Sequence, residues 1–421
     1  MFTKKITNIT AREILDSRGK PTLEATITLD DSSQTTVGVP SGTSTGEVEA
    51  VELRDGDKSR FRGLGVLKAC QKVNTTIKES LVGHDVSHQA EIDQMLIDLD
   101  GTSNKSNLGA NAILATSLAS AIAGARVHEE PLYRYLARTF EVSSVAALPI
   151  PCFNIFNGGK HADTNLDIQE FMVVPKGIVG TQAQVRAGVE IYHSLGQVFR
   201  ESGLDTDTGM EGGYAPDIDS TVDAFKYITE AIERAGYRPG YDVFISLDVG
   251  AAILYDKQKH EYVFKLDNSF LHADQLISLY HDWLDHYPLY SIEDGLDEND
   301  WPGWHQMTQE LGDKVLLVGD DLLATQTKRL EQSIRHQSCN AVIVKPNQVG
   351  TVTETFAFMK LARDNHHVLK AAHRSGETTD TYIVDIAVAG GCQLMKCGGP
   401  SRGERVAKYN RLLQIASELG K

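Results

Sequence analysis

The sequence predicts an α/β protein in which a small α+β domain precedes a larger α/β barrel. Three observations support this prediction. The chain has 421 residues, which is more than one small domain usually holds. Its first part combines strand-like alternation with helical periodicity, and the remainder contains short apolar runs between helix-like segments. We place the first domain at residues 1–142 and the barrel at residues 143–421, because the stretch 143–151 contains two prolines and is the best candidate for a junction.

The elements of the first domain follow from residue periodicity. Residues 23–29 alternate strictly between apolar and polar side chains, as a half-buried strand requires. A second strand is expected at residues 35–39, before Pro40. Helical periodicity then covers residues 65–81, 89–99 and 108–127. The longest uncharged stretch, residues 106–125, contains Asn107, Asn111 and several hydroxyl side chains, so we interpret it as a helix buried in protein and not as a membrane span.

The barrel is predicted from short runs rich in Val, Ile and Leu, which are typical of strands buried on both faces. They lie at residues 171–175, 243–249, 289–292, 315–318, 341–344, 367–372 and 393–395. Six of the runs end at a charged or titratable residue: Asp248, Glu293, Asp320, Lys345, His373 and Lys396. The successive spacings are 45, 27, 25, 28 and 23 residues, and the last four match one strand plus one crossover helix. Because a barrel gathers the carboxyl ends of its strands at one mouth, we expect an active site there.

Composition excludes several classes of protein. The chain has 41 Lys and Arg against 57 Asp and Glu, a formal net charge of −16, which disfavours binding to nucleic-acid phosphates or anionic lipid. An anionic substrate would therefore need cations gathered locally. The five cysteines form no Cys-x-x-Cys pair, which argues against a disulfide framework and a zinc site. No apolar segment follows the first charged residues, so we expect no signal peptide, no membrane insertion and a cytoplasmic location.

The residues at the strand ends suggest metal-assisted acid–base chemistry. Asp248, Glu293 and Asp320 would repel one another in a shared pocket, and an all-oxygen set prefers Mg²⁺ or Mn²⁺. Any one of them alone would more simply be a solvated loop acid, but three in register with the barrel repeat favour the metal. Lys345 lies at the mouth, where neighbouring cations and partial desolvation would lower its pKa. Its spacing fits a general base and a phosphate-binding or ion-pairing lysine equally well.

Other candidates are receptors for an anion or parts of loops. Arg374 and Ser375, directly after His373, offer a bidentate donor and a hydroxyl for phosphate or carboxylate, and Lys396 adds a further cation. The small-residue loop 41–46 could close over a site and offer a hydroxyl oxygen, although such strings are usually connectors. Glu211 lies on a glycine-rich turn, either as a positioned carboxyl group or as an exposed loop residue.

These motifs together resemble the enolase family (phosphopyruvate hydratases) over almost the whole chain. The matching strings lie at residues 11–19, 41–46, 52–58, 104–114, 157–159, 169–172, 373–378 and 405–413. The resemblance implies an N-terminal α+β domain packed against a variant eight-stranded α/β barrel. It also implies the reversible dehydration of 2-phospho-D-glycerate to phosphoenolpyruvate with two Mg²⁺ ions. The enolase superfamily is a known example of a Lys or His base that works with one or two Mg²⁺ ions.

The resemblance also assigns roles by motif position. Asp248, Glu293 and Asp320 would hold the first metal ion, and Ser44 would help to complete the second site. Lys345 would remove the C2 proton, and Glu211, helped by Glu170, would protonate the departing C3 hydroxyl group. His373 would also belong to the catalytic residues. The residues expected to contact substrate are His161, Gln169, Glu170, Arg374, Ser375 and Lys396.

Departures from the family pattern keep alternatives open. They occur at Lys160, Met210, Gly295, Pro346, Ala372, Thr379 and Cys397. One alternative is a paralogue that dehydrates a phosphonate analogue such as carboxyphosphonoglycerate. Another is a non-catalytic surface or scaffold role such as plasminogen binding, since family members also occur at the cell surface or are secreted. The resemblance further implies a homodimer or an assembly of dimers.

Overall fold

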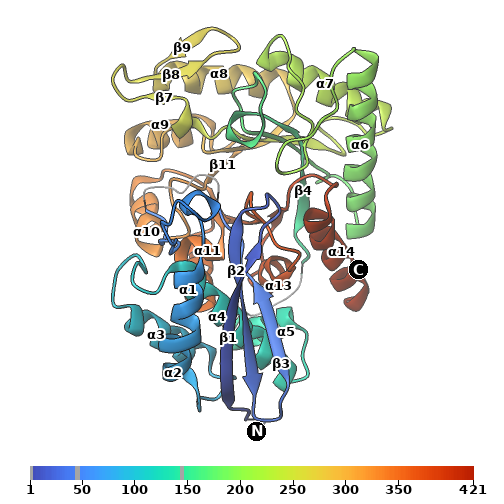
Figure 1. Cartoon of the computed structure of the whole chain (residues 1–421). Coiled ribbons are helices and arrows are strands. Elements are labelled where there is room, and N and C mark those ends of the chain that lie inside the picture. Colours follow the sequence, from blue (N-terminus) through green and yellow to red (C-terminus); the bar gives the residue numbers. More distant parts are fainter. Residues whose placement is uncertain (1–2, 43–47, 143–146) are drawn as a thin grey trace.

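The computed structural model describes residues 3–42, 48–142 and 147–421. It has an antiparallel sheet with helices at the amino end and a closed barrel above it (Figure 1). The sheet has the order β1-β2-β3, with β1 at Ile6–Leu15, β2 at Pro21–Leu29 and β3 at Gln34–Gly38. The predicted strands 23–29 and 35–39 fall in β2 and β3. Strand β1 was not predicted, because only Ile6 and Ile9 are buried in it and its sequence lacks regular alternation.

Helices cover one side of this sheet, and the bounds of all but the last, which was not predicted, agree with the predicted periodicity. A continuous helical stretch runs through α1 (Leu67–Lys72), a π-helical turn (Val73–Ile77) and α2 (Lys78–Leu81). It is followed by α3 (Gln89–Asp100), α4 (Ala110–Val127) and α5 (Leu132–Thr139). Helix α4 is long and apolar enough to cross a membrane, but 83% of it is buried inside the protein. The predicted core helix is therefore confirmed.

The barrel closes in the order β10-β11-β12-β13-β14-β4-β5-β6. Its strands are β4 (Ile150–Asn157), β5 (Glu170–Val174), β6 (Phe244–Asp248), β10 (Leu289–Glu293), β11 (Leu316–Gly319), β12 (Ala341–Val344), β13 (Val368–Ala372) and β14 (Leu394–Lys396). All seven predicted runs are strands. Strand β4 was not predicted as a strand, because Pro149, Pro151 and Asn154 interrupt its apolar pattern. The fold class predicted from the sequence is confirmed.

One strand of the barrel runs against the others. β5 is antiparallel to both β4 and β6, whereas the six other neighbouring pairs are parallel. The amino end of β5 therefore meets the carboxyl ends of the other seven strands. This reversal places residues 169 and 170 at the mouth of the barrel.

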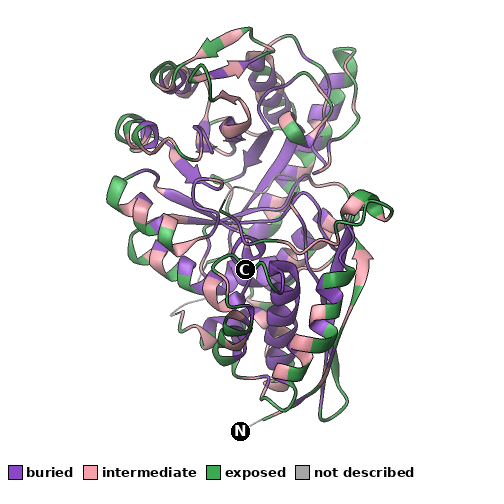
Figure 2. Cartoon of the chain, turned by 60° about the vertical axis from the view of Figure 1, so that its left-hand side comes forward, coloured by how far each residue is buried: buried purple, intermediate pink, exposed green. Residues whose placement is uncertain are grey.

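Helices alternate with the barrel strands, and a small three-stranded sheet extends from the barrel (Figure 1). The helices are α6 (Thr181–Glu201), α7 (Thr221–Arg234), α8 (Ala273–His286), α9 (Trp301–Leu311), α10 (Thr327–His336), α11 (Pro346–Val349), α12 (Val352–Asp364), α13 (Tyr382–Ala389) and α14 (Gly403–Glu418). The small sheet consists of β7 (Tyr255–Asp256), β8 (Glu261–Phe264) and β9 (Ser269–Leu271). Figure 2 shows the barrel strands buried and the outer faces of the helices exposed.

Polar contacts join the amino-terminal sheet and helices to the barrel. Asp93 of α3 accepts hydrogen bonds from Thr353 of α12, at 2.8 Å from the backbone nitrogen and 2.6 Å from the hydroxyl group. Lys105 Nζ lies 2.8 Å from Glu354 Oε1. These buried contacts fix the two parts against each other. All five cysteines are free and buried, so none of them forms a disulfide.

Candidate active site

A narrow polar cavity lies at the mouth of the barrel. Every predicted site residue lines it except Glu293, which is buried beneath it, and Ser44, which lies outside the described residues. The cavity is lined by Glu49, His161, Gln169, Glu170, Glu211, Asp248, Asp294, Asp320, Asp321, Lys345, His373, Arg374, Ser375 and Lys396.

The strand ends place these side chains as the spacing predicted. Asp248, Glu293 and Lys396 are the last residues of β6, β10 and β14, while Asp320, Lys345 and His373 directly follow β11, β12 and β13. Glu170 is the first residue of β5 and lies beside Asp248 in the register of the antiparallel pair. Glu293 lies beside Asp248 on the other side of β6.

Lys396 connects three acids at the floor of the cavity. Its Nζ lies 2.7 Å from Asp248 Oδ2, 2.7 Å from Glu293 Oε1 and 3.2 Å from Glu170 Oε1. The other oxygen of Glu293, Oε2, lies 2.8 Å from Lys370 Nζ, and neither side chain is exposed. Burial alone would raise the pKa of Glu293, but the ammonium groups of Lys370 and Lys396 hold it well below its usual value. Glu293 is therefore a charged carboxylate held on both sides.

Lys345 forms an ion pair with Asp320. Gln348 Nε2 donates a hydrogen bond to the other oxygen of Asp320, at 3.0 Å. The expectation that the pKa of Lys345 is lowered is wrong for this arrangement. Burial does lower it, but the Asp320 carboxylate outweighs burial and the nearby cations, and the pKa is raised. In this arrangement Lys345 is therefore the charged partner of Asp320.

Two carboxyl groups and two histidines form a second cluster across the cavity. His373 Nε2 lies 3.1 Å from Glu211 Oε2, and His161 Nδ1 lies 3.2 Å from Glu170 Oε1 and 3.8 Å from Glu211 Oε1. Burial and the Glu211 charge raise the pKa of Glu170 to about 7. Burial would also raise the pKa of Glu211, but His161 and His373 lower it well below its ordinary value. Glu170 can therefore hold a proton at neutral pH while Glu211 is ionised.

The histidines of this cluster differ in charge. Burial opposes the charged form of His161, but Glu211 and Glu170 outweigh it and raise its pKa to about 9. Burial lowers the pKa of His373 to about 4, and the Arg405 guanidinium contributes in the same direction. At neutral pH, His161 is thus a cation beside two carboxyl groups and His373 is neutral.

Arg374 lines the cavity and is already paired. Its Nη1 lies 3.0 Å from Glu49 Oε2 and donates to Asn347 Oδ1 at 3.2 Å. Its Nη2 donates to Glu49 Oε1 at 3.3 Å. The fully buried Arg405 donates to the backbone oxygens of Arg374 and Ser375, each at 2.7 Å. The Arg374 backbone is therefore held by Arg405, and its guanidinium group is paired with Glu49 from the amino-terminal part of the chain.

The cavity residues fit a divalent cation. Asp248 Oδ1 and Glu170 Oε2 are buried without a hydrogen-bond partner among the described residues. Ligand atoms of Asp294, Asp320 and Asp321 lie within 4.8 Å of one another, as do those of His161, Glu170 and Glu211. Burial and the neighbouring acids raise the pKa of Asp294 well above its usual value and that of Asp321 to about 7. An oxygen-rich site with excess buried acid is suited to Mg²⁺.

The predicted metal ligands are arranged less simply than the sequence suggested. Asp248 and Asp320 line the cavity, but ammonium groups lie between Asp248 and Glu293 and against Asp320. Sequence reasoning did not single out Glu49, Asp294, Asp321, Lys370 or Arg405. The paired acids at positions 293–294 and 320–321 could have signalled two of these residues. The sequence near Glu49 and Lys370 contains no comparable signal.

The departures from the family pattern lie around the cavity, not in its lining. None of Lys160, Met210, Gly295, Pro346, Ala372, Thr379 and Cys397 lines it. Ala372 belongs to an apolar cluster inside the barrel, and Thr379 is exposed. Among the described residues, the polar groups that line the cavity are therefore the predicted site residues other than Glu293, together with Glu49, Asp294 and Asp321.

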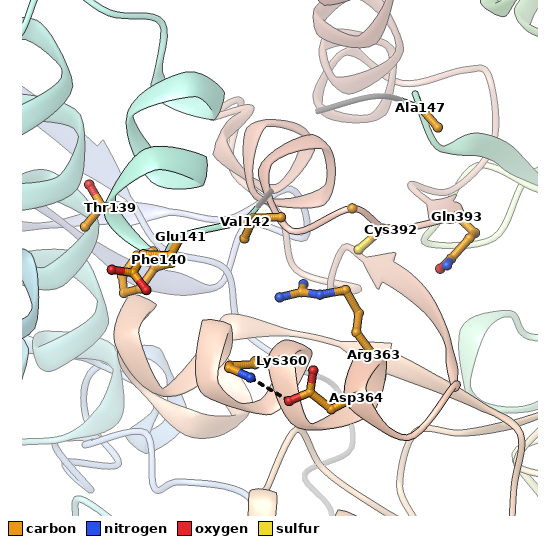
Figure 3. Close-up of a pocket in the computed structure, with 11 residues that line it drawn as sticks. Thr139, Phe140, Glu141, Val142, Ala147, Lys360, Arg363, Asp364, Cys392 and Gln393 are labelled. Carbon is orange, nitrogen blue, oxygen red and sulfur yellow. Dashed lines mark hydrogen bonds and ion pairs between the residues drawn. The ribbon is translucent and has the colours of Figure 1, made fainter. Parts of the chain in front are cut away.

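A wider hollow lies elsewhere, between the end of α5, the end of α12 and the segment before β14 (Figure 3). Its charged groups are engaged locally. Lys360 Nζ lies 2.6 Å from Asp364 Oδ2, and Arg363 Nη1 donates to the backbone oxygen of Gly390. Because its polar groups do not converge on a common point, we assign the chemistry to the narrower cavity.

Comparison with known families covers nearly the whole chain. Residues 6–136 match a family model described as the enolase N-terminal domain. Residues 145–421 match one described as the enolase C-terminal TIM barrel domain.

Proposed function

The chain belongs to the enolase family, and from that premise we propose that it catalyses the Mg²⁺-dependent, reversible dehydration of 2-phospho-D-glycerate to phosphoenolpyruvate. One observation carries this proposal. Lys345, the Glu170–Glu211 carboxyl pair and the receptor Arg374 line the same narrow cavity. Elimination of water needs a base for the C2 proton, an acid for the leaving hydroxyl group and cations for the anionic substrate.

Lys345 supplies the base. Its ammonium group is paired with Asp320, so it must lose this partner before it can accept a proton. Arg374 and Lys396 then lower its pKa, since both cations disfavour the charged form. The C2 proton passes to Lys345 Nζ, and the electron pair of that C–H bond remains on the substrate.

The Glu170–Glu211 pair supplies the acid. The pKa of about 7 lets Glu170 keep a proton at neutral pH, while His161 and His373 hold Glu211 ionised. As the C3–O bond breaks, the proton held by this pair passes to the departing hydroxyl oxygen and water leaves. His161, 3.2 Å from Glu170, balances the charge that remains on the pair.

The remaining residues orient the substrate. Arg374 and Ser375 receive the phosphate group, and Lys396, Gln169 and His161 line the side of the cavity toward the substrate carboxylate and hydroxyl groups. Asp248, Asp320 and Glu293 would hold Mg²⁺, with Ser44 contributing to a second ion. When bound, these ions stabilise the negative charge that develops on the substrate carboxylate.

The proposal is tested by following ultraviolet absorbance as 2-phosphoglycerate becomes phosphoenolpyruvate. We expect a Mg²⁺-dependent rise with the purified, folded protein, and no rise would refute the proposal. Parallel assays on carboxyphosphonoglycerate separate the two candidate substrates. None of the residues that differ from the family pattern lines the cavity, which supports 2-phosphoglycerate as the substrate.

We further propose that the protein is a cytoplasmic homodimer or an assembly of dimers. The acidic net charge and five buried, free cysteines are consistent with a reducing compartment. Leu15, Phe61 and Leu67 are large apolar side chains exposed in the amino-terminal part of the chain, as a subunit interface would require. Sedimentation analysis should give twice the 46.2 kDa chain mass or a multiple of that value.

A further inference from the structure

Lys370 is a buried charge that the proposed mechanism does not use. It lies in β13 between Leu369 and Ala371, and its side chain has no exposed surface. Val368 and Ala372 lie on the same face of this strand as Lys370. Ala372 forms an apolar cluster with Val318, Ala341 and Ile343, and Val368 packs against that cluster. A lysine at this position is costly unless its charge is matched. The matching group is Glu293.

Glu293 is held at both of its oxygens. Oε2 lies 2.8 Å from Lys370 Nζ, and Oε1 lies 2.7 Å from Lys396 Nζ. Lys396 lines the cavity, whereas Lys370 does not. Oε1 is thus the oxygen on the cavity side, and Oε2 is turned toward the barrel interior.

The position of Lys396 shows where a cation can reach Glu293. Its ammonium group is 2.7 Å from both Glu293 Oε1 and Asp248 Oδ2. A metal ion that takes the place of this ammonium group would meet one oxygen from each acid. It could use both oxygens of Glu293 only by breaking the bond between Oε2 and Lys370.

This restriction matters because divalent cations differ in how they bind carboxylates. Mg²⁺ requires near-octahedral coordination with short bonds, and it binds few carboxylates and several waters. Ca²⁺ takes six to eight oxygens and often binds a carboxylate through both of them. A glutamate limited to one oxygen therefore suits Mg²⁺ better than Ca²⁺.

We propose that Lys370 is a positioning residue for metal selection, which limits Glu293 to a single ligand oxygen and so favours Mg²⁺ over Ca²⁺. The inference rests on the proposed function, because it takes Glu293 as a metal ligand. Lys370 would act from inside the barrel, through Glu293, and would not contact the substrate.

The test is calorimetric titration of the substrate-free, full-length protein with MgCl₂ and separately with CaCl₂. In Lys370→Met, a side chain of similar length without charge or donor, we expect the ratio of the Ca²⁺ to the Mg²⁺ dissociation constant to fall by about tenfold or more. Loss of the lysine charge strengthens binding of both ions. Because the ions carry equal charge, that effect largely cancels in the ratio.

Two further variants distinguish the positioning of Glu293 from the loss of the lysine charge and from a general loss of stability. Lys370→Gln removes the charge but keeps a donor for Oε2, so it should keep the wild-type ratio. Lys105→Met removes another buried lysine paired with a glutamate, at 2.8 Å from Glu354 and outside the cavity lining, and should also keep the ratio. If Lys370→Met does not fold, as judged by circular dichroism, Lys370→Leu replaces it.

The outcomes are distinguishable. An unchanged ratio in a folded Lys370→Met or Lys370→Leu protein overturns the inference and leaves the proposed function intact. Equal changes in Lys370→Met and Lys370→Gln assign the effect to charge and also overturn it. Failure of the wild-type protein to bind either cation overturns both the inference and the proposed Mg²⁺ dependence.

Discussion

Glu49 is paired with the guanidinium group of Arg374, to which the proposed function assigns the substrate phosphate. Replacement of Glu49 therefore gives the sharpest prediction. The carboxylate is 3.0 Å from Arg374 Nη1 and within hydrogen-bond distance of Nη2, with both side chains almost fully buried. A substrate anion must displace Glu49 before it can bind Arg374 in the same way. Glu49→Gln should therefore strengthen anion binding and destabilise the protein without ligand.

The structure bounds the size of the effect. Two unit charges about 4 Å apart attract by about 4 kcal/mol at an effective dielectric of 20. Asn347 Oδ1 also accepts from Arg374, and the side-chain amide introduced by Glu49→Gln would keep a weaker hydrogen bond, so the net loss should be about 1.5–3 kcal/mol. Because this pairing exists only in the anion-free state, binding should gain by at most the same amount, or roughly 10- to 100-fold.

The assay is titration calorimetry with 2-phosphoglycerate at saturating Mg²⁺, together with thermal unfolding without ligand. Glu13→Gln is the matched control. Glu13 also lies in the amino-terminal part of the chain, but its carboxylate pairs with Arg60 at 2.6 Å and it does not line the cavity, so substrate affinity should change less than about twofold. Wild-type substrate affinity in Glu49→Gln would refute the competition between Glu49 and the substrate anion for Arg374. Weaker binding would show instead that Glu49 orients Arg374.

The same contacts give four further predictions. Lys345→Met should lower turnover by about a hundredfold or more while calorimetric substrate binding stays within a few-fold; unchanged turnover would exclude Lys345 as the base. Glu170 must be protonated to donate, and burial raises its pKa to about 7, so kcat/KM should fall as pH rises through about 7; Glu170→Gln should remove that limb from the pH profile. Chelation with EDTA should abolish turnover and added Mg²⁺ should restore it; full activity in EDTA would argue against the metal. Asp93→Ala should lower the free energy of unfolding by about 1–3 kcal/mol, because Thr353 loses a buried acceptor; denaturant unfolding with an unchanged midpoint would contradict this.

The strands and their terminal residues were predictable for a simple physical reason. Strands such as β12 are buried on both faces, so their sequences are short apolar runs that end where the chain reaches the polar mouth. Lys345 and Asp320 were predicted solely from this change from apolar to charged residues at the end of a strand. Glu170 could not be found in the same way, because β5 is reversed and brings its first residue, not its last, to the mouth. It was identified only through the resemblance.

Pairing across the cavity was beyond sequence reasoning. Glu49 comes from the amino-terminal part of the chain and Arg374 from the segment after β13, and no periodicity joins them. Lys370 lies within an apolar strand, and the sequence gives no sign that its charge is paired. The structure shows that its partner is Glu293. The pKa of Lys345 was predicted in the wrong direction for the same reason, since the prediction counted cations but not the Asp320 carboxylate.

Under the proposed function, the charge of the cavity links cation binding to substrate binding. The net charge of −16 leads one to expect positive charge concentrated here, but the described lining has seven acidic residues and three Lys or Arg residues. Lys345, Arg374 and Lys396 are each already paired with an acid. An anion approaching this cavity would meet no unpaired lysine or arginine among the described residues of its lining. Divalent cations that engage Asp248, Glu293 and Asp320 would weaken the ion pairs of Lys396 and Lys345. The cavity would then hold more positive charge with which to accept a phosphorylated acid.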